Sequence, residues 1–167
     1  PDPGPFDAVM AGSLNALRAL RRRSGFTPDW FSKRLYAVGP GTAAAARDAG
    51  WIDIVTGTGG MQDLARQIEA DGLGAGFFAH LRGVHIRHDP ADLLPEASIV
   101  PVVLYEAHAL DGLTLPVLEA LERGAVFGVV FYSARTAEIF LRAVAQGGLV
   151  CDFSRVHALC IAPAVLE

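Results

Sequence analysis

The sequence predicts an α/β protein of two lobes, each with a parallel sheet covered by helices, and with the second lobe incomplete in this chain. Three observations support this class. Short apolar runs alternate with amphipathic stretches, the runs are almost continuously apolar, and one strand-helix pattern occurs twice. With 51% hydrophobic and 19% charged residues among 167, the chain can bury a substantial core, which excludes wholesale disorder.

Seven apolar runs are predicted to be the strands. Parallel strands covered on both faces read as continuous apolar runs, whereas strands with one solvated face alternate between apolar and polar residues. The expected strands are Phe6 to Ala11, Leu35 to Val38, Ile52 to Thr56, Gly76 to Leu81, Ile99 to Tyr105, Val126 to Tyr132 and His157 to Ile161.

Amphipathic stretches between these runs are predicted to be helices. Apolar residues recur at helical spacing after Ser13, after Gly60 and after Ser133, and a further helix is expected around Leu115 to Arg123. The first amides of a helix have no partner within the helix, so a side-chain oxygen often accepts from them. Ser13, Thr42 and Ser133 are expected to be such N-caps.

An internal repeat predicts that the two lobes are similar. In the first copy, a strand ends at Ser13, a helix follows, and the next strand ends in a turn of small residues around Pro40. The second copy repeats this order from Ser133 to a turn around Pro163. The second copy stops at Glu167, and so few strands would leave a sheet edge and an apolar face uncovered. We therefore expect the second lobe to be incomplete.

Charge and composition exclude several classes of partner. The net charge of -4 gives no electrostatic reason to bind a nucleic acid. No apolar run approaches the roughly 20 residues that span a bilayer, and the amino-terminal sequence lacks the cationic start of a signal peptide. The two cysteines, Cys151 and Cys160, form no C-x-x-C motif and are expected to be buried thiols of a reducing compartment. We expect a cytoplasmic monomer without nucleic-acid or membrane partners.

Five segments form an ordered set of motifs, and they are Phe6 to Leu20, Tyr36 to Trp51, Leu81 to Gly83, Val103 to Tyr105 and Val130 to Ala137. In this order and spacing they resemble the uroporphyrinogen-III synthase family along nearly the whole chain. The resemblance implies two flavodoxin-like lobes, one inserted in the sequence of the other. Residues 1–104 would form the inserted lobe, residues 105–111 the connection, and residues 112–167 part of the split lobe.

The same resemblance implies a lyase of haem biosynthesis that needs no cofactor and no metal. Its substrate is hydroxymethylbilane, a linear tetrapyrrole with many carboxylates, which would lie between the lobes. The enzyme cyclises it to uroporphyrinogen III with inversion of ring D and loss of water. Helix amino termini can bind carboxylates without Lys or Arg. The family motifs place substrate-binding residues at Ser13, Gly39, Gly41, Thr42 and Ser133.

Tyr105 matches the family's interdomain tyrosine, and it is the expected catalytic residue. A phenol can give a proton to the departing hydroxyl of the bilane. The same residues also have purely structural interpretations, since Tyr105 could be an aromatic anchor at a strand end and the serines could be helix caps.

A non-catalytic tetrapyrrole-binding or anion-binding regulatory module on the same scaffold is the alternative function. Gly12 supports it, because family members often carry threonine there. Ala162 and Val165 likewise replace the glycine and threonine of the first copy's turn. A nucleotide-binding enzyme is disfavoured, because the turn at Gly39 and Gly41 does not extend to G-x-G-x-x-G.

Three histidines, His80, His85 and His88, lie within nine residues of sequence. On a strand, His80 and His88 would share a face, but no cysteine or carboxylate completes a known ligand spacing. We interpret them as residues of a solvated strand end rather than as a metal site.

Overall fold

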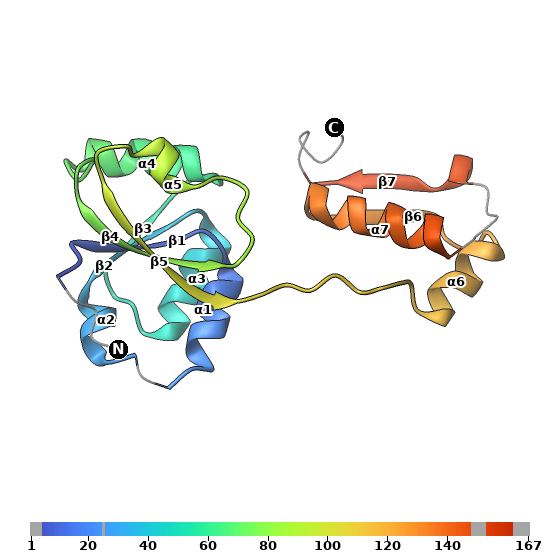
Figure 1. Cartoon of the computed structure of the whole chain (residues 1–167), viewed down its shortest axis with the longest axis horizontal. Helices are drawn as coiled ribbons and strands as arrows, with labels where there is room; N and C mark the ends of the chain where they lie inside the picture. The colour runs from blue at the N-terminus through green and yellow to red at the C-terminus, as the bar shows by residue number, and fades with distance from the viewer. Residues whose placement is uncertain (1–4, 25, 148–152, 162–167) are drawn as a thin grey trace. The chain divides into compact units, whose positions relative to one another are not determined.

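The computed structural model describes residues 5–24, 26–147 and 153–161. It divides the chain into two compact units, residues 1–107 and 108–167. Among the described residues, each unit contains a parallel sheet of its own, with five strands in the first unit and two in the second (Figure 1). The predicted α/β class is therefore confirmed.

The sheet of the first unit has a strand order that changes direction at its centre. Its strands are β1 (Ala8–Ala11), β2 (Arg34–Ala37), β3 (Ile54–Thr56), β4 (Phe77–Gly83) and β5 (Ser98–Tyr105), in the order β3-β2-β1-β4-β5. All neighbours are parallel, so all carboxyl ends meet at one edge. The chain leaves β1 towards β2 and later returns to its other side with β4. In open α/β sheets, ligands bind at such a switch point.

Helices cover both faces of this sheet, as Figure 1 shows. One face carries α1 (Leu14–Arg21), α2 (Pro28–Ser32) and α3 (Pro40–Ala49), and the other carries α4 (Met61–Ala70) and α5 (Pro90–Leu93). The two faces form separate cores. Val9 and Ala11 of β1 contribute to the first core and Ala8 and Met10 to the second, which explains why the strands are continuously apolar.

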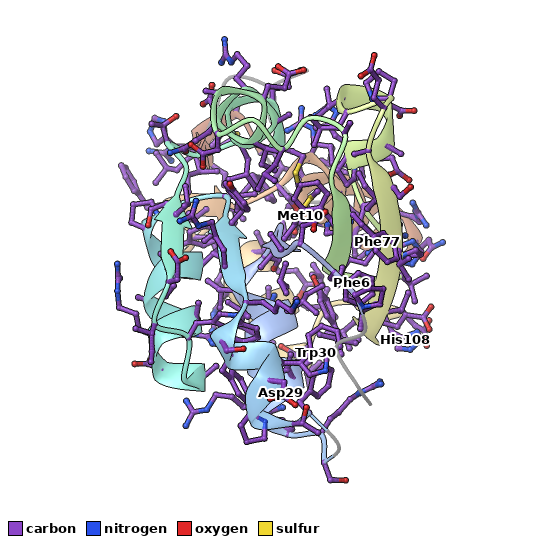
Figure 2. The ribbon with its side chains drawn as sticks, turned by 90° about the vertical axis from the view of Figure 1, so that its left-hand side faces the viewer. Phe6, Met10, Asp29, Trp30, Phe77 and His108 are labelled. Atoms are coloured by element: carbon purple, nitrogen blue, oxygen red, sulfur yellow. The ribbon has the colours of Figure 1, made fainter. Side chains whose placement is uncertain are left out.

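Aromatic side chains close the amino end of the sheet. The ring centroid of Phe6 lies 4.7 Å from that of Phe77 and 6.0 Å from that of Trp30, and the side-chain view shows these rings together beside the strand ends (Figure 2). Trp30 is buried, and Asp7 accepts a 2.8 Å hydrogen bond from the backbone nitrogen of Phe77 through its carboxylate. These contacts hold the segment before β1 against the start of β4 and against α2.

The second unit is smaller and contains the elements α6 (Leu115–Glu122), β6 (Gly128–Phe131), α7 (Ala134–Gln146), a 3-10 helix (Phe153–Arg155) and β7 (His157–Cys160). Strand β6 pairs with β7 in parallel. The ring of Phe140 on α7 lies 5.5 Å from that of Phe131 on β6. Within the described residues, no helix of either unit has the length and apolarity needed to span a bilayer.

All seven predicted strands are present, and their ends agree with the prediction within two residues. Ser13 and Ser133 cap α1 and α7 as expected. The prediction for Thr42 was wrong. Helix α3 begins at Pro40 with Gly39 as its N-cap, and Thr42 is buried in the first turn. Proline's fixed φ suits the first helical position, so the helix starts before the threonine.

Two further expectations concern residues near the end of the chain. Cys160, expected to be buried, is only half-buried, because the described part of its sheet has two strands. Cys151 and the turn around Pro163 lie outside the described residues.

Candidate active site

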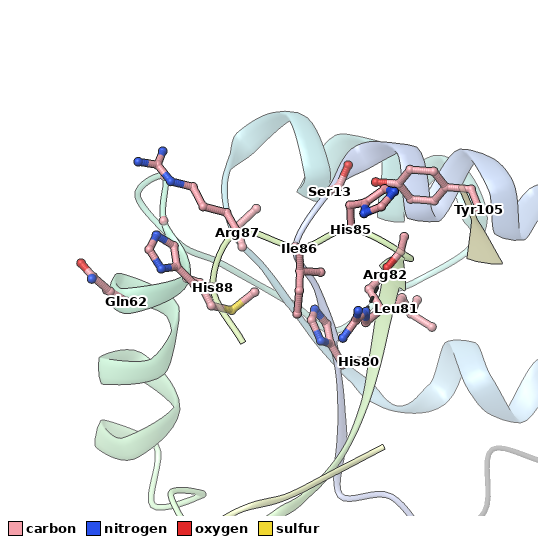
Figure 3. Close-up of a pocket in the computed structure, with 16 residues that line it drawn as sticks. Ser13, Gln62, His80, Leu81, Arg82, His85, Ile86, Arg87, His88 and Tyr105 are labelled. Carbon is pink, nitrogen blue, oxygen red and sulfur yellow. Dashed lines mark hydrogen bonds between the residues drawn. The ribbon is translucent and has the colours of Figure 1, made fainter. Parts of the chain in front are cut away.

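A cavity of about 360 Å³ opens at the carboxyl ends of the first unit's strands (Figure 3). Its lining comes from the segments after β1 and β2, the start of α4, the end of β4 with the loop that follows, and the end of β5. The residues are Gly12, Ser13, Val38, Gly59, Gly60, Met61, Gln62, His80, Leu81, Arg82, Gly83, His85, Ile86, Arg87, His88 and Tyr105. The ends of β1 and β4 both contribute, so the cavity lies at the switch point of the sheet.

Ser13 marks the point where β1 passes into α1. Its backbone is extended, and its Oγ accepts a 3.1 Å hydrogen bond from the backbone nitrogen of Asn15. This bond satisfies one of the free amides at the start of the helix. The amino terminus of α1, with its partial positive charge, therefore lies at the cavity.

The start of α4 is a second helix terminus at the cavity, and it was not among the predicted site residues. Gly59 has φ 138°, a left-handed conformation that favours glycine. Gly60 is the N-cap and makes no side-chain cap bond, so the first amides of α4 are not satisfied by a capping side chain. The loop is held by Asp63, which accepts a 2.6 Å hydrogen bond from the hydroxyl of Thr58 and pairs with Arg66. These bonds, the Thr58 bond first, lower the pKa of Asp63.

Tyr105, the last residue of β5, lies in the cavity beside the end of β4. A Cβ at Gly83 would lie 2.7 Å from Cζ of Tyr105, so the phenol ring lies directly against the backbone of Gly83. Gly83 does not have a positive φ, and what it provides is space. Arg82 shapes the loop that follows, since its Nε and Nη2 donate to the carbonyls of Gly83 and Val84 at 2.9 and 2.8 Å. The segments Leu81 to Gly83 and Val103 to Tyr105, far apart in sequence, thus form one wall.

The interpretation of the histidines as a solvated strand end was wrong for His80. This side chain is 2% exposed and lies on β4, on the floor of the cavity. Burial, and after it the charge of Arg82, lowers its pKa to about 4, while Asp89 opposes the shift. His85 and His88 are exposed but follow the end of the strand, so His80 and His88 do not share a strand face. No group of three or more His, Cys, Asp or Glu side chains suited to a metal occurs within the described part of the chain.

The lining is rich in nitrogen-bearing side chains. Two arginines and three histidines line the described cavity and no carboxylate does, although the chain has a net charge of -4. Glu106 is near its edge, with Oε1 3.9 Å from Nε2 of His85. The sequence prediction assigns anion binding to helix termini alone, and it does not include Arg82 and Arg87. A signal existed, because five Arg and His residues fall between positions 80 and 88, over the end of a buried strand and the loop that follows it.

The structure brings some of the expected site residues together and separates others. Ser13 and Tyr105 both line the cavity. Gly39 lies beside it, since a Cβ there would be 3.7 Å from Cα of Gly59. Gly41 lines a separate hollow between α1 and α3, and the buried Thr42 is not part of the lining.

Ser133 belongs to the second unit. Its Oγ accepts from the backbone nitrogen of Thr136 at 3.2 Å and lies 2.8 Å from the hydroxyl of the same residue. These contacts make it the cap of α7.

Comparisons with known proteins agree on one family. A family model described as uroporphyrinogen-III synthase HemD matches residues 2–167, whereas no curated protein matches the chain significantly. The uroporphyrinogen-III synthetase structure from Helicobacter pylori superposes with a TM-score of 0.67 at 21% identity, covering 99% of this chain and 72% of that one. A mutant uroporphyrinogen III synthase from Thermus thermophilus gives 0.63 at 21% identity, covering 96% and 66%. A further Thermus thermophilus structure gives 0.55 at 20% identity, with the same coverage. At these identities the structures establish a shared fold.

Proposed function

Because the chain belongs to the uroporphyrinogen-III synthase family, we propose that this protein cyclises hydroxymethylbilane to uroporphyrinogen III with loss of water. The observation that carries the proposal is the cavity at the switch point, with two helix amino termini, Arg82 and Arg87 on its walls and no carboxylate among its described lining residues. Such a site suits a polyanion. The family match supports the lyase chemistry, and the cavity supports the substrate class.

The cavity is suited to part of the substrate. Its volume of about 360 Å³ lies near the lower end of the range of small-molecule sites. A linear tetrapyrrole with its carboxylate arms is larger than a compact drug-sized ligand, so we assign one or two pyrrole rings to this cavity. Arg82, Arg87 and the amides at the starts of α1 and α4 would bind the carboxylates of those rings.

Tyr105 is the proposed proton donor. In the step we assign to it, the C–O bond of the terminal hydroxymethyl group breaks and the leaving oxygen takes the phenol proton, so that water departs. The pyrrole nitrogen lone pair stabilises the carbon that remains, which then bonds to the substituted carbon of the last ring. Rearrangement through the spiro intermediate inverts that ring. The proton released on closure restores the phenol, so the only by-product is water.

The bilane cyclises without an enzyme, but to the uninverted isomer, so the main task of the protein is to hold one geometry. Ser13 and Gly39 are proposed to contribute to binding from the carboxyl ends of β1 and β2. Gly41 and Thr42 support the turn of α3, and Ser133 is a proposed binding residue of the second unit.

We further propose that the protein works as a cytoplasmic monomer. Size-exclusion chromatography with light scattering can test the oligomeric state, and cell fractionation can test the location.

The test supplies hydroxymethylbilane to the protein and measures which uroporphyrinogen isomer accumulates. We expect type III above the spontaneous type I. Tyr105→Phe should lower kcat with little change in KM, because it removes only the phenol oxygen. Tyr36→Phe removes the same atom from a tyrosine outside the cavity lining and should keep the wild-type kcat. If the protein binds the bilane saturably but only uroporphyrinogen I accumulates, the result would support the non-catalytic regulatory module instead.

Arg82→Gln and Arg87→Gln test the anion site. Each should raise KM about 10-fold, since hydrogen bonds to charged groups contribute about 1.5–3 kcal/mol. Arg123→Gln alters an exposed arginine of the second unit and serves as the matched control. A KM equal to that of the wild type in both cavity variants would contradict the assignment of the carboxylates to this cavity.

A further inference from the structure

His80 is a buried group that the proposed mechanism does not use. Of the described Asp, Glu, His, Lys and Arg residues, it alone is buried, with 2% of its surface exposed. It lines the floor of the cavity, and Figure 3 shows its ring below Ile86 and near Arg82. No hydrogen bond to its ring is present among the described residues. The fully buried polar atoms without a partner among the described residues are Oγ1 of Thr27 and Nε1 of Trp51, so the ring nitrogens of His80 are not sealed in the core. Since the ring lines the cavity, it offers a hydrogen-bonding position that a ligand can fill.

The space beside the imidazole depends on Gly12. A Cβ added there would lie 3.5 Å from Nε2 of His80 and 3.2 Å from Cε of Met61. Gly12 does not have a positive φ, so its backbone conformation does not require glycine. What the missing side chain provides is a gap next to Nε2. Glycine at this position therefore leaves Nε2 of His80 facing open space in the cavity.

The surroundings of this gap favour a neutral, flat group. Met61, Ile86 and Leu81 give the floor apolar walls. Burial keeps the imidazole uncharged near neutral pH, since its pKa is lowered to about 4. A pyrrole ring is flat and largely apolar, and it needs only one acceptor for its N–H. An uncharged imidazole provides that acceptor.

We propose that Nε2 of His80 accepts a hydrogen bond from a pyrrole N–H of the bilane, in the gap left by Gly12. His80 is then a substrate-binding residue of the first unit, and one pyrrole ring lies between Met61 and Ile86. This inference rests on the proposed function. It adds a binding contact for the ring itself, separate from the contacts to carboxylates.

Three variants test the inference in the same isomer assay. His80→Leu removes the acceptor and should raise KM about 3- to 10-fold, the effect of one neutral hydrogen bond, and should lower the type III fraction. His80→Gln keeps a hydrogen-bonding group and should recover most of the loss. Gly12→Ala keeps His80 but fills the gap, so it should also raise KM. Gly112→Ala adds the same methyl group where nothing lies within 4 Å, and it should behave as the wild type.

The outcomes separate the two proposals. If the wild type forms type III and His80→Leu matches it in KM and isomer ratio, the histidine contact is refuted while the proposed function stands. If Gln does not recover what Leu loses, packing rather than a hydrogen bond explains the effect, and the inference is again refuted. If the wild type forms only type I, the proposed function fails and the inference fails with it. The fluorescence of Trp30 and Trp51, both buried in the first unit, checks that each variant is folded.

Discussion

Gly83 is the residue at which the site leaves least room. Its hydrogen atoms face the ring of Tyr105, and any larger residue must displace that ring. The same wall carries Arg82, whose guanidinium donates to the carbonyls of the next two residues, Gly83 and Val84. The position of the proposed proton donor thus depends on a residue with no side chain.

Gly83→Ala should therefore lower activity to the level of Tyr105→Phe. A methyl group 2.7 Å from Cζ forces the ring away and costs about 1–3 kcal/mol in the free energy of unfolding, as overpacking commonly does. The two measurements are kcat and urea unfolding followed by tryptophan fluorescence. Wild-type kcat in Gly83→Ala would show that the position of the ring does not matter to the reaction.

His80 also gives the first unit a defined pH dependence. Its pKa is about 4 when folded and about 6.5 when unfolded. Between these values the unfolded chain binds the proton and the folded chain does not, so acid favours unfolding. The stability is complete above pH 6.5 and is lost as the pH falls towards 4. The full loss is about 3 kcal/mol, and about 2 kcal/mol of it is reached at pH 5.

This is measured by urea unfolding at pH 7 and pH 5 for the wild type and His80→Leu. The wild type should lose about 2 kcal/mol more than the variant over this interval. Carboxylates titrate in both proteins, and their contribution cancels in the comparison. Equal losses in the two proteins would mean that His80 is not held uncharged in the fold.

Elements are joined to one another by a few polar contacts. Strand β2 is tied to the end of α4 by Tyr36, whose hydroxyl donates a 2.7 Å hydrogen bond to Oδ2 of Asp71, the C-cap of that helix. Burial, and after it this bond, raises the pKa of Tyr36 to about 12. The phenol stays protonated at neutral pH, and its contribution is lost only as the pH rises from about 10 towards 12.

Tyr36→Phe should lower the free energy of unfolding by about 2 kcal/mol, because it leaves a partly buried carboxylate without this donor. Urea unfolding at pH 7 measures the change. Asp71→Asn, which keeps an oxygen acceptor, should lose less. A stability equal to the wild type in Tyr36→Phe would show that water or Arg34 satisfies the carboxylate equally well.

Helix α1 depends on its cap for its start. Ser13→Ala removes the oxygen that accepts from Asn15 and should cost about 1 kcal/mol. Urea unfolding followed by the fluorescence of Trp30 and Trp51 measures this change in the free energy of unfolding of the first unit. Ser133→Ala removes the corresponding cap from α7 in the second unit, which contains no tryptophan, and should leave that transition unchanged.

At the scale of the whole molecule, the first unit has the cores of an independent domain. Both hydrophobic clusters are built from residues between Phe6 and Tyr105. A chain of residues 1–107 should therefore unfold cooperatively in urea, with the midpoint that tryptophan fluorescence reports for the longer chain. A broad, uncooperative transition would show that the clusters need the second unit.

The helices and strands could be predicted from the sequence, because each depends on the order of apolar and polar residues within its own segment. Buried parallel strands are apolar throughout, and a serine before an amphipathic stretch marks a helix start, so both Ser13 and Ser133 were placed correctly. Thr42 was misplaced because proline two residues earlier starts the helix sooner.

The site was harder to predict than the fold, because it depends on residues that only tertiary structure brings together. The burial of His80 follows from its position under α4 and the loop after β4, which no local pattern encodes. The strand order places the end of β4, with Arg82, beside the end of β1, and spacing in the sequence does not reveal that order.

The chain as a whole has an excess of acidic residues, but its cavity is lined by arginine and histidine. This distribution of charge affects the rate at which substrate binds. The substrate proposed here reacts on its own, so an enzyme that acts on it must capture it before it closes unaided. A local concentration of positive charge focuses the electric field and raises the encounter rate of a polyanion. Ions screen this attraction beyond about 8 Å at physiological salt. Added salt would then lower the association rate of the bilane, so that more of it would cyclise spontaneously to the type I isomer. This holds even where the equilibrium affinity hardly changes.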